Sequence, residues 1–104
     1  MSFNEKDLYT LAISLVKETE FELNFESKVI SLLEAIMDKN PEAIELVFRG
    51  VDEETKDEIA EAANLAVVKA QTKIEEDILD NGSIEEIEVL NDFKEAQMRI
   101  FENL

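Results

Sequence analysis

Residues 77–88, with the sequence DILDNGSIEEIE, contain most of the ligands of an EF-hand calcium loop. Asp77, Asn81 and Glu88 occupy loop positions 1, 5 and 12, which supply oxygen ligands in such loops. Position 3 must also supply an oxygen ligand, but here it is Leu79, whose side chain cannot coordinate a cation. The missing ligand argues against a calcium site, and we predict neither a metal nor another cofactor.

The same residues match a tight turn between two helices. Gly82 follows the end of a helical pattern, where a left-handed residue is wanted, and Asn81 tolerates that conformation. Ser83 and Glu86 have the spacing of a capping box that opens the next helix. Because this interpretation uses every residue, the sequence predicts a helical hairpin at this point.

Several kinds of catalytic chemistry are excluded by composition. The chain has no cysteine, which rules out disulfides, thiolate chemistry and Cys-ligated zinc. It has no histidine, which rules out His-ligated metals, Ser-His-Asp triads and the Glu-x-x-His di-iron motif. The remaining enzymatic option is a carboxylate cluster that holds magnesium, and our expectation is a protein that is not an enzyme.

Two sets of carboxylates could in principle form a magnesium cluster. They are Glu53, Glu54, Asp57, Glu58 and Glu61, and later Asp77 and Asp80. Their spacing faintly resembles the all-α nucleotide pyrophosphohydrolases, which use an E-E-x-x-E set and a later E-x-x-D set on facing helices. Aspartate replaces glutamate in both sets. On one continuous helix the two sets would lie ~30 Å or more apart, so one pocket would need a partner subunit or a broken helix.

The charge balance is strongly acidic. Twenty-six acids oppose ten bases, which gives a formal net charge of −16 at pH 7. Residues 1–51 carry ten acids and five bases, a net of −5, whereas residues 52–104 carry sixteen acids and five bases, a net of −11. Such a surface repels DNA phosphates and anionic membranes. We therefore expect no direct nucleic-acid or membrane binding, and a basic protein surface as partner.

The acids are most concentrated around the predicted turn. Between Ile74 and Phe93 the chain has eight acids and no base. They are Glu75, Glu76, Asp77, Asp80, Glu85, Glu86, Glu88 and Asp92, and we predict them to be the partner-binding residues. A hairpin would gather these charges at one end of the molecule. Four of them would lie in the last turns of a helix, where the helix dipole disfavours negative charge. The alternative interpretation is a solvated face that serves only solubility.

Three functions remain open at this point. The leading one is a small non-enzymatic protein that binds a basic surface of a partner, such as a nucleic-acid-binding protein, as a nucleic-acid mimic. In charge and helicity, though in no aligned motif, the chain is similar to small helical DNA-mimic inhibitors of phages and mobile elements, such as T7-type antirestriction proteins. The second is a helical assembly or scaffold protein, for which a homodimer is one form. The third is the magnesium-dependent pyrophosphohydrolase.

Length and composition favour a single all-α domain that spans residues 1–104. The chain is 45% hydrophobic, enough for a core, and its two glycines and one proline punctuate it too rarely for a β-sheet protein. No apolar run approaches the ~20 residues needed to cross a bilayer, and no N-terminal signal segment is apparent. We expect a soluble, cytoplasmic protein.

Three helices are predicted in the first half. Ser2 and Glu5 form a capping box, after which Leu8, Leu11, Ala12, Leu15 and Val16 mark one face. The stretch FELNF (21–25) is predicted to be a hinge whose aromatic rings enter the core. Asn24 is expected to cap a second helix with Val29, Leu32, Leu33, Ile36 and Met37 on one face. NPEA (40–43) starts a short third helix, which carries Ile44, Val47 and Phe48 and stops at Gly50.

Two longer helices follow and form the predicted hairpin. Asp52 caps a helix over about residues 53–80, and the last helix covers about residues 84–103. The first has a main stripe of Ile59, Ala62, Ala63, Ala66, Ala70, Ile74 and Ile78, and a second stripe of Leu65, Val68 and Leu79. The last presents Ile84, Ile87, Leu90, Phe93, Ala96, Ile100 and Leu104. The sequence thus predicts a compact bundle of about five helices that ends in a long helical hairpin.

Overall fold

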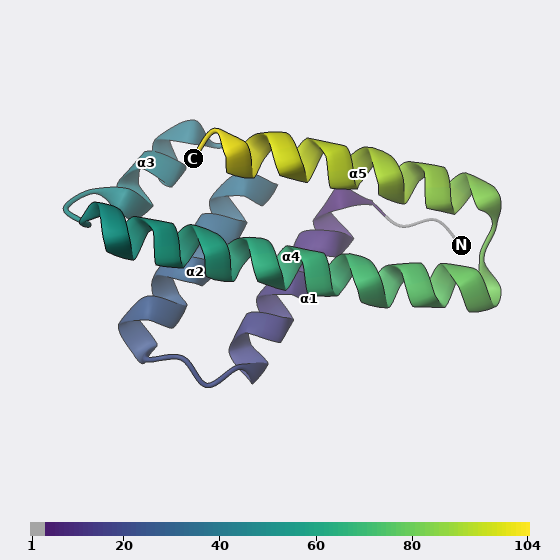
Figure 1. Cartoon of the computed structure of the whole chain (residues 1–104), viewed down its shortest axis with the longest axis horizontal. Helices are drawn as coiled ribbons and strands as arrows, with labels where there is room; N and C mark the ends of the chain where they lie inside the picture. Colours follow the sequence, from purple (N-terminus) through teal and green to yellow (C-terminus); the bar gives the residue numbers. More distant parts are fainter. Residues whose placement is uncertain (1–3) are drawn as a thin grey trace.

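The computed structural model describes residues 4–104, except for the side chain of Asn81. This part of the chain contains five α-helices and no strand (Figure 1). They are α1 (Glu5–Glu18), α2 (Leu23–Met37), α3 (Pro41–Phe48), α4 (Glu53–Asn81) and α5 (Ile84–Glu102). The predicted all-α bundle with a C-terminal helical hairpin is confirmed. No helix of the described residues is long and apolar enough to cross a membrane.

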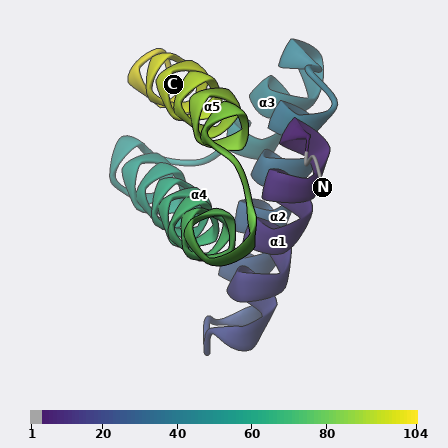
Figure 2. The ribbon, with the colours of Figure 1, turned by 90° about the vertical axis from the view of Figure 1, so that its right-hand side faces the viewer.

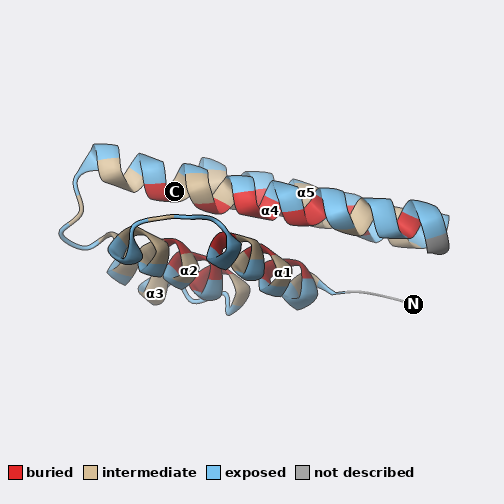
Figure 3. Cartoon of the chain, turned by 90° about the horizontal axis from the view of Figure 1, so that it is seen from below, coloured by how far each residue is buried: buried red, intermediate tan, exposed pale blue. Residues whose placement is uncertain are grey.

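The helices form two layers. Helices α1, α2 and α3 make one layer, and the α4–α5 hairpin lies across it, with the two longer helices steeply inclined to α1 and α2 (Figures 1 and 2). Helix α4 packs against α1, α2 and α5, so it is the element common to both layers. The buried residues face the boundary between the layers, whereas the outer faces are exposed (Figure 3). The molecule is elongated, with extents of 44 × 26 × 19 Å.

Small side chains of α4 meet larger ones of the opposite layer in the core. The buried cluster contains Leu8, Tyr9, Ala12, Val16, Val29, Leu32, Leu33, Ile36, Ile59, Ala63, Ala66, Val67 and Ala70. The alanines of the predicted main stripe permit the close approach of α1, the helix against which α4 packs most extensively. Phe21 and Phe25 are partly buried against the same cluster, as predicted, but residues 23–25 belong to α2, so the predicted hinge over residues 21–25 is too long.

The start of α1 differs from the prediction. The N-cap is Asn4, whose side chain accepts a hydrogen bond from the Asp7 amide at 2.9 Å, while the Asp7 carboxylate accepts one from the Asn4 amide at 3.0 Å. The predicted pair of Ser2 and Glu5 is wrong as the cap of this helix, and Ser2 lies outside the described residues. Asn4 and Asp7 have the spacing of a second, overlapping capping box, one that the prediction overlooked.

Helix α2 begins without a side-chain cap. It starts at Leu23, the N-cap position belongs to Glu22, and Asn24 lies inside the first turn, so the predicted Asn24 cap is wrong. The rings of Phe21 and Phe25 instead contact each other across the start of the helix, with centroids 5.2 Å apart. Apolar packing fixes the direction in which the chain enters α2, in the manner of a hydrophobic staple.

The starts of α3 and α4 agree with the prediction. Asn40 accepts from the Ala43 amide at 3.2 Å ahead of Pro41, and Asp52 accepts from the Thr55 amide at 3.3 Å. Gly50 has φ +76°, the left-handed conformation that glycine adopts most readily, which ends α3 and redirects the chain into α4.

The second apolar stripe of α4 is largely exposed and is not part of the buried core. Leu65, Val68 and Leu79 are 54%, 42% and 67% exposed, although α4 itself packs against α1, α2 and α5. Helix α5 lies instead over the face of α4 that carries Gln71. On that face Gln71 has a hydrogen-bonding partner on α5, Gln97. Val67, which the predicted stripes did not include, is fully buried.

Candidate functional site

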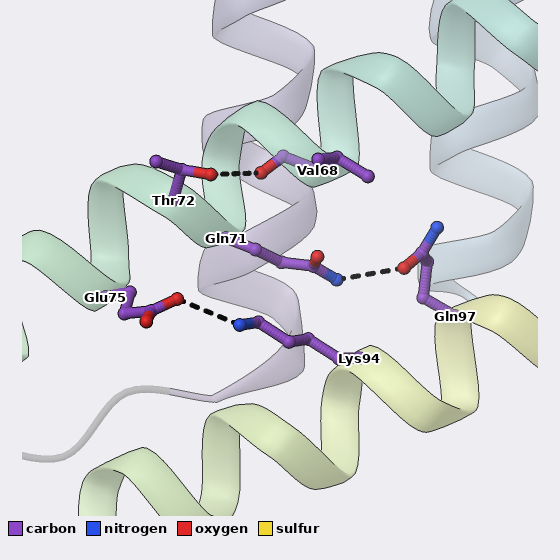
Figure 4. Close-up of polar contacts among 6 residues, drawn as sticks. All are labelled: Val68, Gln71, Thr72, Glu75, Lys94 and Gln97. Atoms are coloured by element: carbon purple, nitrogen blue, oxygen red, sulfur yellow. Dashed lines mark hydrogen bonds and ion pairs between the residues drawn. The ribbon is translucent and has the colours of Figure 1, made fainter.

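Polar contacts join the two arms of the hairpin in the middle of α4, among them those of Gln71 with Gln97 and Glu75 with Lys94 (Figure 4). The Gln71 Nε2 donates to the Gln97 Oε1 at 3.1 Å, and the Gln97 Nε2 donates to the Oδ1 of Asn64. Closer to the bend, the Lys94 Nζ lies 2.9 Å from the Glu75 Oε2. These contacts place the two acidic arms side by side, which confirms the predicted hairpin.

The bend is made by two residues, Gly82 and Ser83, between α4 and α5. Gly82 has φ −108°, so the predicted left-handed conformation is wrong. Its amide donates to the Ile78 carbonyl at 2.7 Å, and a Cβ on residue 82 would lie 3.0 Å from the Cα, Cγ2 and O of Ile78. Glycine is therefore needed for a close approach rather than for a special backbone angle.

Ser83 occupies the N-cap position of α5, but its side chain forms no capping hydrogen bond. The predicted capping box with Glu86 thus placed Ser83 correctly at the N-cap position. The predicted hydrogen bond from the helix start to the serine side chain is absent. Residues 77–81, the first five positions of the hypothetical calcium loop, belong to α4. The segment has the geometry of a helix end and not of an open loop.

The eight predicted partner-binding acids all lie on the bend-proximal part of the hairpin, and we call them the acidic tip. Six are exposed: Glu76, Asp77, Asp80, Glu85, Glu88 and Asp92. Glu86 is only partly buried, and Glu75 has a side chain 43% exposed. Six to seven carboxylates are consequently presented to solvent at one end of an elongated molecule.

The ion pair of Glu75 with Lys94 was missed from the sequence. The acid-only segment was counted to Phe93, and the next residue, Lys94, reaches back across the hairpin. Glu75 lies seven residues before Gly82, whereas Lys94 lies eleven residues after Ser83, so equal spacing from the bend would not have identified this pair. With both side chains more than a third exposed, such a pair stabilises the hairpin by under about 1 kcal/mol.

The helix dipoles act on the two arms in opposite ways. Glu85 and Glu86 lie in the first turn of α5, where negative charge is favourable. Asp77 and Asp80 lie near the end of α4, whose last turn contains no basic residue, and there negative charge is unfavourable. The α4 arm therefore keeps carboxylates at a cost to its own stability.

Two large apolar side chains are more than half exposed within the acidic tip, and Val89 there is 39% exposed. Leu79 is 67% exposed and Ile84 is 76% exposed. Both were predicted to belong to apolar helix faces, and for both that prediction is wrong. Figure 1 shows why: the bend projects past the end of α1, so the first layer does not reach it. Leu79 and Ile84 lie on either side of the bend, and each is next in the sequence to a carboxylate, Asp80 and Glu85 respectively.

The two carboxylate sets of the hydrolase hypothesis are not brought together. Helix α4 is continuous from Glu53 to Asn81, so Glu54 and Asp77 are separated by roughly 35 Å at 1.5 Å per residue. In residues 4–104, no three potential metal-ligating side chains converge. Comparisons of the chain with models of protein families, with curated proteins and with solved structures gave no significant match.

Proposed function

We propose that this protein is a non-enzymatic interaction protein whose acidic tip binds a basic surface of a partner protein. Where that surface normally binds DNA or RNA, the tip acts as a nucleic-acid mimic and blocks it. The observation that carries the proposal is the exposure of Leu79 and Ile84 among the carboxylates of the tip.

Leu23 and Leu46 are exposed elsewhere on the protein, but Leu79 and Ile84 are exposed next to carboxylates at one end of it. Protein interfaces combine an apolar centre that loses its water with a polar rim. Full burial of such a side chain contributes about 1.5–3 kcal/mol. The surrounding carboxylates, such as Asp80 and Glu85, add steering toward a cationic partner and repel anionic ones.

The same charges disfavour a scaffold built by tip-to-tip association of two copies. Such an interface would bring the tip carboxylates of one copy against those of the other. Like charges that face each other in a partly dehydrated contact repel strongly. A basic partner could cover the exposed Leu79 and Ile84 and also pair with the carboxylates around the bend.

The test is affinity capture from a lysate of the host with a tip variant and a matched control. The tip variant carries Glu76→Lys, Asp77→Lys, Asp80→Lys and Glu88→Lys. Glu75 is spared because it pairs with Lys94, and Glu85 and Glu86 because they stabilise the start of α5. The control carries Glu18→Lys, Glu20→Lys, Glu34→Lys and Glu45→Lys, which are exposed residues outside the tip. Both variants have the same net charge.

We expect the wild-type protein and the control to capture the same basic protein, which is released at high salt. The tip variant should lose it, with a circular dichroism melting curve that shows a folded protein. A separate variant, Leu79→Ser with Ile84→Ser, should weaken capture without changing net charge. Equal capture by the tip variant and the control would refute the proposal.

A further inference from the structure

A second surface lies away from the acidic tip, where the middle of α4 faces the connection between α1 and α2. It is a groove with a volume of about 630 Å³. Its lining residues are Phe21, Phe25, Ala62, Leu65 and Val68, together with Glu58, Glu61 and Asn64. The apolar residues dominate, and they come from two elements that the core holds in place.

Rigid apolar walls face each other across this groove. On one side the rings of Phe21 and Phe25 pack against each other and against the core. On the other side Leu65 and Val68, one turn apart on α4, are 54% and 42% exposed. These are the residues of the second apolar stripe, which no helix of the described chain covers. Large apolar side chains in a fixed concave setting are typical of a docking site.

The charges of the groove specify its occupant. Glu58 and Glu61 are the only charged residues in its lining, and both are acidic. A second copy of this chain, with its own net charge of −16, would bring its carboxylates to an already negative surface. A partner with apolar anchors and flanking lysine or arginine satisfies both the walls and the rim. Charge complementarity thus favours a basic occupant over self-association.

The length of the groove suggests the form of that occupant. The lining residues of α4 run from Glu58 to Val68, which is about 15 Å of helix. An amphipathic helix of about three turns, with apolar anchors at i, i+3 or i+4, and i+7, matches that length. Its anchors would pack between the phenylalanine rings and the Leu65 and Val68 side chains.

We infer that this groove docks a basic amphipathic helix of a partner protein. The inference does not depend on the acidic tip, because it uses none of the tip residues. The protein then has two separate docking surfaces, one at the bend and one beside the middle of α4.

The test is fluorescence anisotropy with a labelled helical peptide of leucine and lysine, in which leucine occupies the i, i+3, i+4 and i+7 positions. A second peptide has the same composition with the order permuted, so that no apolar face forms. Leu65→Ser with Val68→Ser removes one wall at exposed positions and should weaken binding of the amphipathic peptide by roughly tenfold or more. Glu58→Gln with Glu61→Gln should weaken it a fewfold, mainly at low salt.

The tip variant serves here as the matched control, and it should bind the amphipathic peptide as the wild-type protein does. Amide chemical shifts in the NMR spectrum should change at Phe25, Leu65 and Val68. Absence of binding, equal binding of the permuted peptide, or equal loss in the tip variant would overturn the inference. So would a wild-type dimer that becomes a monomer in Leu65→Ser with Val68→Ser, because the occupant would then be a second copy. Failure of lysate capture alone would refute only the function of the tip.

Discussion

The polar contact between the arms of the hairpin can be tested by replacing Gln97 with methionine, which has a similar shape and no hydrogen-bonding amide. Gln71 and Gln97 are only 4% and 5% exposed, so the Gln71 amide would lose its partner in a place that water barely reaches. An orphaned buried polar group costs about 1–3 kcal/mol. Asn64 is less buried and regains water, so its loss is smaller. Burial of the methionine side chain offsets part of the cost, and we expect a net loss of ~1–2 kcal/mol.

Urea denaturation followed by circular dichroism measures this loss, and a double variant separates the cause. In Gln71→Met with Gln97→Met no buried donor is left orphaned, so its free energy of unfolding should return to within about 1 kcal/mol of the wild-type value. The two single variants should each be less stable than the double variant. If Gln97→Met were as stable as the wild-type protein, or if the two substitutions were additive, the hydrogen bonds would not determine how α5 sits on α4.

Two further predictions concern ionisable groups. Burial, with a smaller effect of the Glu5 carboxylate, raises the pKa of Tyr9 from 10.0 to about 12. Below pH 10 both folded and unfolded chains keep this proton, and between pH 10 and 12 the unfolded chain loses it first, so stability should fall by about 2–3 kcal/mol as pH rises through this range. Tyr9→Phe should lack this component of the loss, and because Tyr9 is the only tyrosine, tyrosinate absorbance with a midpoint near 10 in the folded protein would contradict the prediction. At the end of α4, Asp77→Asn with Asp80→Asn should raise the free energy of unfolding by ~0.5–1 kcal/mol, whereas Glu85→Gln at the start of α5 should lower it; a shift of the same sign in both would show that the dipole is not the cause.

Helix positions were predictable because punctuation and apolar spacing agree along most of this chain. Asn40 with Pro41, Gly50 and Asp52 each mark a boundary that the structure confirms. The start of α1 was less certain from local sequence, because two overlapping capping boxes compete within a few residues. At α2 the start is set by the packing of Phe21 on Phe25, a tertiary effect that no local cap reveals.

The arrangement of the arms could be predicted only in part. The alternation of apolar and polar residues indicated two faces on α4, but it could not show that α5 would choose the one with Gln71 over the one with Leu65 and Val68. The partner of Gln71 on the covered face is Gln97, which is far away in sequence. The ion pair of Glu75 with Lys94 depends on the register of the hairpin. The location of the acidic tip could be predicted, because a turn at Gly82 places the residues before and after it at the same end of the hairpin.

Helix α5 depends on α4 for its packing, so the contact between these two helices is a weak point of the structure. Among the described residues of α5, only Leu90 and Gln97 are buried, while the buried cluster is made by α1, α2 and α4. Amide hydrogens of α5 should therefore exchange through a local opening that leaves the remaining helices intact, at a lower free energy than global unfolding. The carboxylates of both arms lie together only while α5 is packed on α4. A partner bound at the bend would therefore slow the hydrogen exchange of α5. The protection of α5 amides would then report whether the acidic tip is occupied.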